Sequence, residues 1–155
     1  MRPKYLPLLI CISFLLMTGI TGCGKPYAKT YFQTSERLNP DDQGRALSVV
    51  VRIYQLKNKQ NLENADFYRL WSNEADVLEG DILDKEEVTL YPDSENMFKI
   101  TRKPEANYIG VVAFFRKPVG NSWRAILPLK KKREKIYLTL VEQGIKATKS
   151  KKEWK

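Results

Sequence analysis

Short apolar segments separated by turn-forming residues run along most of the chain and predict a protein built mainly of β-strands. In residues 48–56 the β-branched side chains favour a strand, and apolar residues at odd and even positions indicate that both faces are covered. The same pattern predicts a central strand at residues 108–116. Pro128 indicates that another strand, 123–129, lies at a sheet edge or contains a bulge, because proline cannot donate a ladder hydrogen bond. The other predicted strands are 29–38, 87–91, 96–102, 135–142 and 145–148.

One segment has the period of a helix. Between about residues 64 and 79, apolar residues recur every three or four positions, which predicts a single amphipathic helix. Asn64 or Asp66 is a suitable N-cap, and Gly80 is a suitable stop. We interpret the apolar stripe as core packing, with the indole of Trp71 buried against a sheet. The stripe consists of Phe67, Leu70, Trp71, Ala75 and Leu78.

Eight strands and one inserted helix, at about residues 64–79, predict a mainly β fold in which two sheets form a β-sandwich. The chain contains no internal repeat and no sign of a second domain. We therefore expect one sandwich domain at residues 29–149. A short tether at 23–28 precedes it, and a basic tail at 150–155 follows it.

The first residues have the three parts of a secretory signal. Arg2 and Lys4 form a basic region, residues 6–20 are mostly apolar, and small residues precede Cys23. About fifteen apolar residues are too few to cross a bilayer, which takes about 20. Ile20-Thr21-Gly22-Cys23 resembles the bacterial lipobox, so we expect residues 1–22 to be removed and Cys23 to carry lipid. An ordinary signal peptide or a short membrane anchor is the alternative.

Two residue types limit the chemistry available to the mature chain. Removing residues 1–22 from 155 leaves 133 residues with Cys23 as the remaining cysteine, so a disulfide within the chain is excluded. Histidine is absent altogether, which excludes Cys–His and Ser–His–Asp nucleophilic sites and the usual zinc sites. No metal site is predicted, and we expect no cofactor apart from the covalent lipid.

A pair of carboxylates could still support catalysis, as in glycosidases. The acidic residues cluster on what we interpret as a helix end and its following loop, and a solvated surface is the favoured interpretation. The cluster consists of Glu74, Asp76, Glu79, Asp81, Asp84, Glu86 and Glu87.

Positive charge is concentrated near the C-terminus. Residues 23–129 carry 15 basic and 15 acidic side chains, whereas residues 130–155 carry 10 basic and 3 acidic ones. A nucleic acid is not an expected partner for a secreted protein. The tail could contact anionic lipid headgroups or could be a solvated terminus, and the sequence leaves both open. The lysines concerned are Lys146, Lys149, Lys151, Lys152 and Lys155.

The order of several motifs resembles one protein family. After the lipobox come the turn Leu38-Asn39-Pro40-Asp41, the strand residues 50–56, the helix residues 65–71, and the segment 110–116 followed by Trp123-Arg124. In this order and spacing the motifs are similar to the type VI secretion system lipoproteins called TssJ or VasD. The basic segment 130–135 and the lysine-rich tail are not part of that pattern.

The resemblance implies a transthyretin-like sandwich without catalytic activity, held at the periplasmic face of the outer membrane. Gly24 after the lipidated cysteine agrees with that location under the enteric sorting rule. The implied partner is the periplasmic domain of TssM, an IcmF-like inner-membrane protein, and an indirect association with the TssL-containing complex follows.

In the family, the loop between the first two strands contacts the partner. Here it comprises Asn39, Pro40, Asp41, Asp42, Gln43, Gly44, Arg45, Ala46 and Leu47. Its mixture of charged and apolar residues is typical of an interface, although it could be a simple connection. Two other functions stay open, namely an enzyme with paired carboxylates and a different lipoprotein binding module. Such a module could be a secretion pilot or a carrier with an apolar cavity inside the sandwich.

Overall fold

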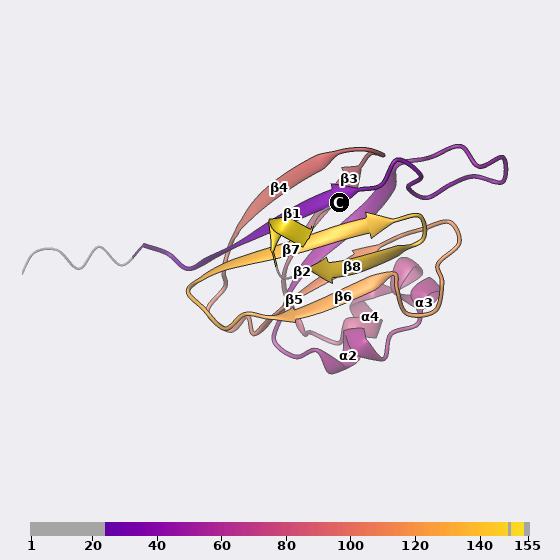
Figure 1. Cartoon of the computed structure of the whole chain (residues 1–155). Helices are drawn as coiled ribbons and strands as arrows, with labels where there is room; N and C mark the ends of the chain where they lie inside the picture. The colour runs from indigo at the N-terminus through magenta and orange to yellow at the C-terminus, as the bar shows by residue number, and fades with distance from the viewer. Residues whose placement is uncertain (1–23, 149, 154–155) are drawn as a thin grey trace, which may run out of the picture.

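The computed structural model describes residues 24–148 and 150–153, which form two four-stranded sheets packed face to face (Figure 1). The first sheet has the strand order β4-β1-β7-β8, and the second has the order β3-β2-β5-β6. The predicted two-sheet sandwich is confirmed, whereas its transthyretin-like character stays a prediction. The strands are β1 (Tyr27–Thr34), β2 (Val49–Leu56), β3 (Ile82–Leu90), β4 (Glu95–Thr101), β5 (Tyr108–Ala113), β6 (Arg124–Pro128), β7 (Arg133–Val141) and β8 (Gly144–Thr148).

The first sheet is mixed, because β1 is antiparallel to β4 and parallel to β7. Alternate residues of β1 are buried, so that Ala28 and Phe32 face the core while Tyr27 and Tyr31 face outward. The strand starts and ends earlier than predicted, at Tyr27 and Thr34. In the second sheet β6 is an edge strand, as Pro128 predicted.

Both faces of β2 and β5 are covered, which confirms the interpretation of their continuous apolar segments. One face packs into the core between the sheets, and the inserted helices lie against the other (Figure 1). At Gly110 a side chain would have no room, since a Cβ atom would lie 2.5 Å from a methyl carbon of Leu62 and 3.0 Å from one of Leu56. Glycine therefore allows the first helix to approach β5 closely.

The prediction of one helix over residues 64–79 is wrong. The insertion contains three short helices, α2 (Gln60–Glu63), α3 (Phe67–Ser72) and α4 (Glu74–Leu78). Asp66 caps α3 by accepting a hydrogen bond from the backbone N–H of Arg69. Asn73 ends α3 and begins α4 with a φ of −144° and a ψ of 62°, which no helix contains. This break at Asn73 explains why a continuous helical period does not produce a continuous helix.

The prediction of a buried stripe is wrong in part. Leu70 and Leu78 are fully buried, but Trp71 is 52% exposed and Ala75 is also exposed. Leu70 and Trp71 are neighbours in α3, and successive helical side chains point about 100° apart, so Leu70 enters the core while Trp71 lies half exposed against Phe114.

The expectation for the acidic cluster is also corrected. Asp84, Glu86 and Glu87 lie within β3, not in a loop after a helix. That strand begins at Ile82, five residues earlier than predicted, and forms the other edge of the second sheet. Charged side chains suit an edge strand, because they oppose pairing with another chain.

Candidate partner-binding site

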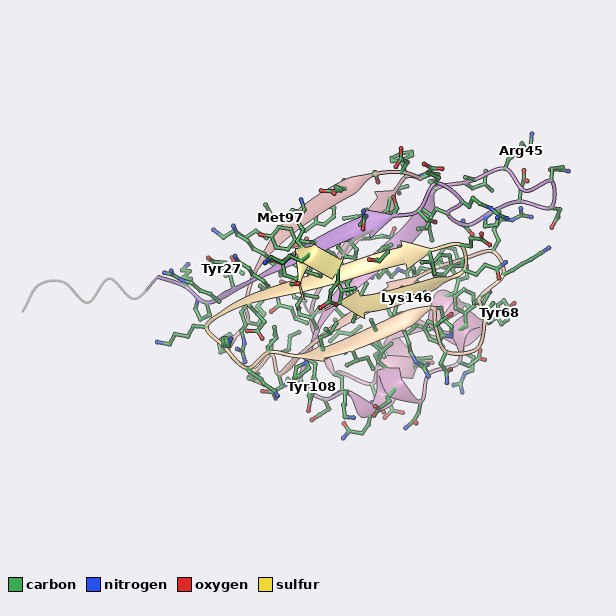
Figure 2. The ribbon with its side chains drawn as sticks, viewed as in Figure 1. Tyr27, Arg45, Tyr68, Met97, Tyr108 and Lys146 are labelled. Carbon is green, nitrogen blue, oxygen red and sulfur yellow. The ribbon has the colours of Figure 1, made fainter. Side chains whose placement is uncertain are left out.

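The loop at residues 39–47 projects from one end of the sandwich, opposite the end where the described chain begins (Figures 1 and 2). In Figure 2, Arg45 marks the loop and Tyr27 marks the start of β1. The loop is closed by two backbone hydrogen bonds. Leu47 N–H donates to the Leu38 carbonyl at 3.0 Å, and Asp41 N–H donates to the Arg45 carbonyl at 2.9 Å. The connection is therefore an ordered projection.

Asn39 holds the base of this loop. Its backbone has a φ of 46°, a left-handed conformation that asparagine tolerates better than most residues. The side chain is only 5% exposed and makes two hydrogen bonds. Its Nδ2 donates to the Ser48 carbonyl at 2.7 Å, and its Oδ1 accepts from Arg116 N–H at 2.8 Å. Asn39 thus positions the loop without presenting its own side chain to solvent.

Asp41 organises the tip. Its Oδ1 accepts from the backbone N–H groups of Gln43 and Arg45, both at 2.9 Å, and its Oδ2 pairs with Arg45 Nε at 2.7 Å. Partial desolvation raises the pKa of Asp41, but these hydrogen bonds from Arg45 and Gln43 outweigh it and leave the pKa lowered. Gly44, with a φ of 77°, completes the turn. The tip residues Asp42, Gln43 and Arg45 are left exposed.

Asp42 connects the loop to the segment after β5. Its carboxylate lies 2.6 Å from Lys117 Nζ and 3.5 Å from Arg116 Nη2. The hydrogen bond from Lys117 and the nearby cations lower the pKa of Asp42. These contacts join residues about 75 positions apart. The sequence analysis missed them, because charge alone does not identify which distant partner a residue meets.

Next to this loop lies an aromatic hollow of about 300 Å³. Tyr68 and Trp71 are 69% and 52% exposed, and the Trp71 ring lies 4.7 Å from the ring of Phe114. Arg116 lines the hollow and also faces Asp42, so the hollow and the loop form one continuous surface. We call loop 39–47 and this hollow together the loop-end surface. The hollow is lined by Phe67, Tyr68, Trp71, Phe114, Phe115 and Arg116.

The sequence analysis missed the hollow, because the helical period assigned Trp71 to the core. The sequence did contain a signal for an interface here, because the pair Phe114-Phe115 stands immediately before Arg116 and Lys117. Aromatic and arginine side chains are the residue types that contribute most to protein interfaces.

A polar network supports the hollow from below. The Arg52 guanidinium lies 5.4 Å from the Trp71 ring centre and 4.7 Å from that of Phe114. It also forms salt bridges with Glu74 at 3.2 Å and Glu87 at 2.7 Å. Tyr54, which is fully buried, donates its hydroxyl to Glu74 at 2.5 Å. The network holds the floor of the hollow in one arrangement.

The ionisation of Glu74 follows from this network. Burial raises its pKa, but hydrogen bonds from Lys85 and Tyr54 and the charge of Arg52 have the larger effect and leave the pKa lowered. Burial and the hydrogen bond to Glu74 raise the pKa of Tyr54. A carboxyl group with a lowered pKa is ionised at neutral pH and is a poor general acid. Asp41, Asp42 and Glu74, the described carboxyl groups with a shifted pKa, all have it lowered.

Two further observations concern a cavity for an apolar ligand and a metal site. A larger hollow of about 510 Å³ lies at the surface near the end of β1, where polar residues such as Gln33, Thr34 and Thr139 line it. Within residues 24–148 and 150–153, no group of three acidic, histidine or cysteine residues could hold a metal ion.

The predicted lipid site, Cys23, lies outside the described residues, which begin at Gly24. Tyr27, the first residue of β1, follows three residues later. In the described part of the chain no helix is long and apolar enough to cross a membrane.

Comparison with known proteins gives consistent results. A family model described as type VI secretion lipoprotein, VasD, EvfM, TssJ matches residues 26–146. A comparison with curated proteins found no match. Among solved structures, Serratia marcescens Lip, a membrane-bound component of the type VI secretion system, is similar with a TM-score of 0.75 and 20% identity, over 80% of this chain and 98% of Lip.

Two further structures are similar at higher identity. A chain in a type VI membrane complex aligns with a TM-score of 0.74 and 26% identity, over 81% of this chain and 99% of that chain. A chain in a structure of the TssM C-terminal domain from EAEC aligns with a TM-score of 0.70 and 25% identity, over 81% of this chain and 99% of that one.

Proposed function

Because the chain belongs to the type VI secretion lipoprotein family of TssJ and VasD, we propose that it is a non-catalytic scaffold of the secretion membrane complex. In this role it binds the periplasmic domain of TssM, the IcmF-like inner-membrane protein, through the loop-end surface. Contact with the TssL-containing complex is then indirect, through TssM. The match to chains in a type VI membrane complex and in a TssM domain structure supports this partner.

The observation that carries the proposal is that the start of β1 and loop 39–47 lie at opposite ends of one sandwich. The chain enters β1 at one end, and loop 39–47 projects from the other (Figure 2). A protein built in this way can connect a membrane to a distant partner without a conformational change. The loop-end surface also has suitable chemistry, because exposed Tyr68 and Trp71 lie beside the charged tip residues Asp42 and Arg45.

We further propose that Cys23 carries diacylglycerol and an N-acyl chain, and that these hold the protein at the periplasmic face of the outer membrane. Several acyl chains anchor a protein stably, whereas a single one gives marginal binding. Only residues 24–26 separate Cys23 from β1, so the anchored end of the sandwich lies close to the bilayer.

The test replaces residues 40–45 with a short Gly-Asn linker, which keeps Asn39 and its two hydrogen bonds in place. Calorimetry of the soluble chain, from residue 24 onward, against the TssM periplasmic domain should show a Kd raised at least about tenfold, equivalent to about 1.4 kcal/mol. The matched control is the double variant Lys57→Gln/Lys59→Gln, which changes two half-buried lysines that follow the end of β2 remote from the loop.

The control variant should bind as the wild type does. Unchanged affinity of a correctly folded loop variant would remove the loop from the interface. Absence of binding even by the wild-type chain would remove TssM as the partner. Circular dichroism and the unfolding midpoint establish that each variant is folded.

A further inference from the structure

Three lysines lie side by side on the outer face of the first sheet. Lys29 of β1 is the register partner of Lys99 on β4 and of Lys135 on β7. In the preceding row Tyr27 is paired with Arg133. Cations therefore occupy adjacent positions on three neighbouring strands. We call Lys29, Lys99, Arg133 and Lys135 the cationic row.

Such an arrangement is unfavourable in an isolated domain, because like charges directly opposite each other on neighbouring strands destabilise a sheet. The salt bridges of the described residues include none with a member of the row. By contrast, Lys57, Lys59 and Lys117 each pair with a carboxylate. Lys29, Lys99 and Arg133 instead surround the ring of Tyr27, with their charged groups 6.0, 4.8 and 5.8 Å from its centre.

Glu134 and Glu95, two carboxylates of the described residues on β7 and β4, do not compensate this charge. Glu134 follows Arg133 in sequence, but it is the register partner of buried Ala28, and alternation directs it to the opposite face of β7. Glu95 lies two rows away, opposite Gln33, and is paired with Lys151 at 2.9 Å. That contact also engages Lys151 of the tail, for which the sequence left lipid contact and a solvated terminus both open.

The row lies at the anchored end of the molecule. Tyr27 and Arg133 begin β1 and β7, and the exposed turn 130–132 precedes β7 at the same end (Figure 1). From Cys23 to Tyr27 the extended chain spans about 14 Å. This length is an upper limit, so the tether is short enough for the cationic row to approach the leaflet, where attraction to anionic headgroups acts over a Debye length of about 8–10 Å at physiological salt.

The next row along the sheet is aromatic and apolar. Tyr31 and Tyr137 stack with their ring centres 4.9 Å apart, and Met97, the register partner of Tyr31, is 49% exposed. Tyrosine rings beside a band of cations are typical of protein surfaces at the membrane–water interface.

We infer that the cationic row and the tyrosines beside it dock on the anionic phospholipid headgroups of the leaflet that holds the acyl anchor. This inference rests on the proposed anchoring through Cys23. Docking would make a second contact next to the tether and would restrict the orientation of the sandwich. The loop-end surface, at the far end of β1, would then stay directed away from the bilayer.

The test uses the processed, lipid-bearing chain purified from membranes and added to preformed vesicles. One set of vesicles is phosphatidylcholine alone, and the other contains about 30% phosphatidylglycerol. A membrane-impermeant amine-acylating reagent then labels exposed lysines, and mass spectrometry measures each labelling rate. On the anionic vesicles, labelling of Lys29, Lys99 and Lys135 should be about fivefold slower at low salt, and about 1 M salt should abolish the difference. Lys57 and Lys59 should label equally on both.

Two variants with the same change in charge identify the surface responsible. In Lys99→Gln/Lys135→Gln, Lys29 should lose its protection, whereas in Lys57→Gln/Lys59→Gln it should keep it. Equal labelling of the cationic row on neutral and anionic vesicles would overturn the inference, as would protection of Lys29 that survives loss of Lys99 and Lys135. Flotation with neutral vesicles reports the acyl anchor alone, so a failure of the anchor is distinguished from a failure of the row.

Discussion

Replacement of Asn39 by alanine tests how the partner loop is held. The substitution removes both side-chain hydrogen bonds, to the Ser48 carbonyl and from Arg116 N–H. Each is worth about 1 kcal/mol net, because the unfolded chain bonds to water instead. A left-handed backbone at this position adds about 1 kcal/mol of strain for alanine. The expected loss in the free energy of unfolding is therefore about 3 kcal/mol.

Asp93 supplies the matched control. Its φ is 51°, close to the 46° of Asn39, but its side chain is exposed and none of the side-chain hydrogen bonds found in the described residues involves it. Asp93→Ala therefore carries the backbone strain without the lost hydrogen bonds. We expect it to lower the free energy of unfolding by about 1 kcal/mol.

Urea denaturation of the soluble chain, followed by tryptophan fluorescence, measures both variants. With a slope of roughly 1–2 kcal/mol per molar urea, the midpoint should fall by about 1.5–3 M for Asn39→Ala and by about a third of that for Asp93→Ala. If Asn39→Ala lost no more stability than Asp93→Ala, the side-chain hydrogen bonds of Asn39 would contribute nothing to stability. Asn39 would then not stabilise the base of the loop.

Three further predictions concern the core, the polar network and the lipid anchor. Leu70→Ala should lower the free energy of unfolding by about 2–5 kcal/mol, whereas Trp71→Ala, at a 52% exposed position, should lower it by roughly 1 kcal/mol. Equal losses for the two variants in urea denaturation would contradict the placement of α3. Because the folded pKa of Glu74 is lowered, its charge stabilises the fold above its ordinary value of 4.5 and progressively less as pH falls below it. Glu74→Gln should therefore be less stable than wild type at pH 7, with the difference narrowing below pH 4.5, and a gap that stays constant across this range would refute the network. Cys23→Ser should abolish acyl labelling and release the folded chain from membranes, so an acylated mutant would disprove the lipid site.

The strands were predictable because their signals are local. Residues 48–56 and 108–116 have apolar side chains at both odd and even positions, a pattern typical of a strand that is covered on both faces. β2 and β5 are covered in this way. Asp66 was predictable as a helix cap because an N-cap bonds to a backbone N–H three residues away. The projecting loop was located by its turn formers, since Pro40 and Gly44 restrict the backbone locally.

The failures have one physical origin. The period of apolar residues shows which positions can form one face, but it does not show where a helix breaks or how much of that face a sheet covers. Asn73 divides the predicted helix, and the sheet covers Leu70 but leaves Trp71 half exposed, where it lines the aromatic hollow. This part of the loop-end surface was therefore assigned to the core.

By itself, the sequence located the strands and the segment that forms the loop, excluded histidine chemistry and predicted a signal with a lipobox, because each depends on residues close together in the chain. Tertiary structure alone decided the contact of Asp42 with Lys117 and the alignment of Lys29 with Lys99 and Lys135. These pairs are separated by 70 or more residues. Asp42 meets Lys117 because β2 pairs with β5 in the second sheet, and the lysines align because β1 pairs with β4 on one side and β7 on the other in the first. Strand order is set by how all the apolar faces pack together, and no local pattern contains that information.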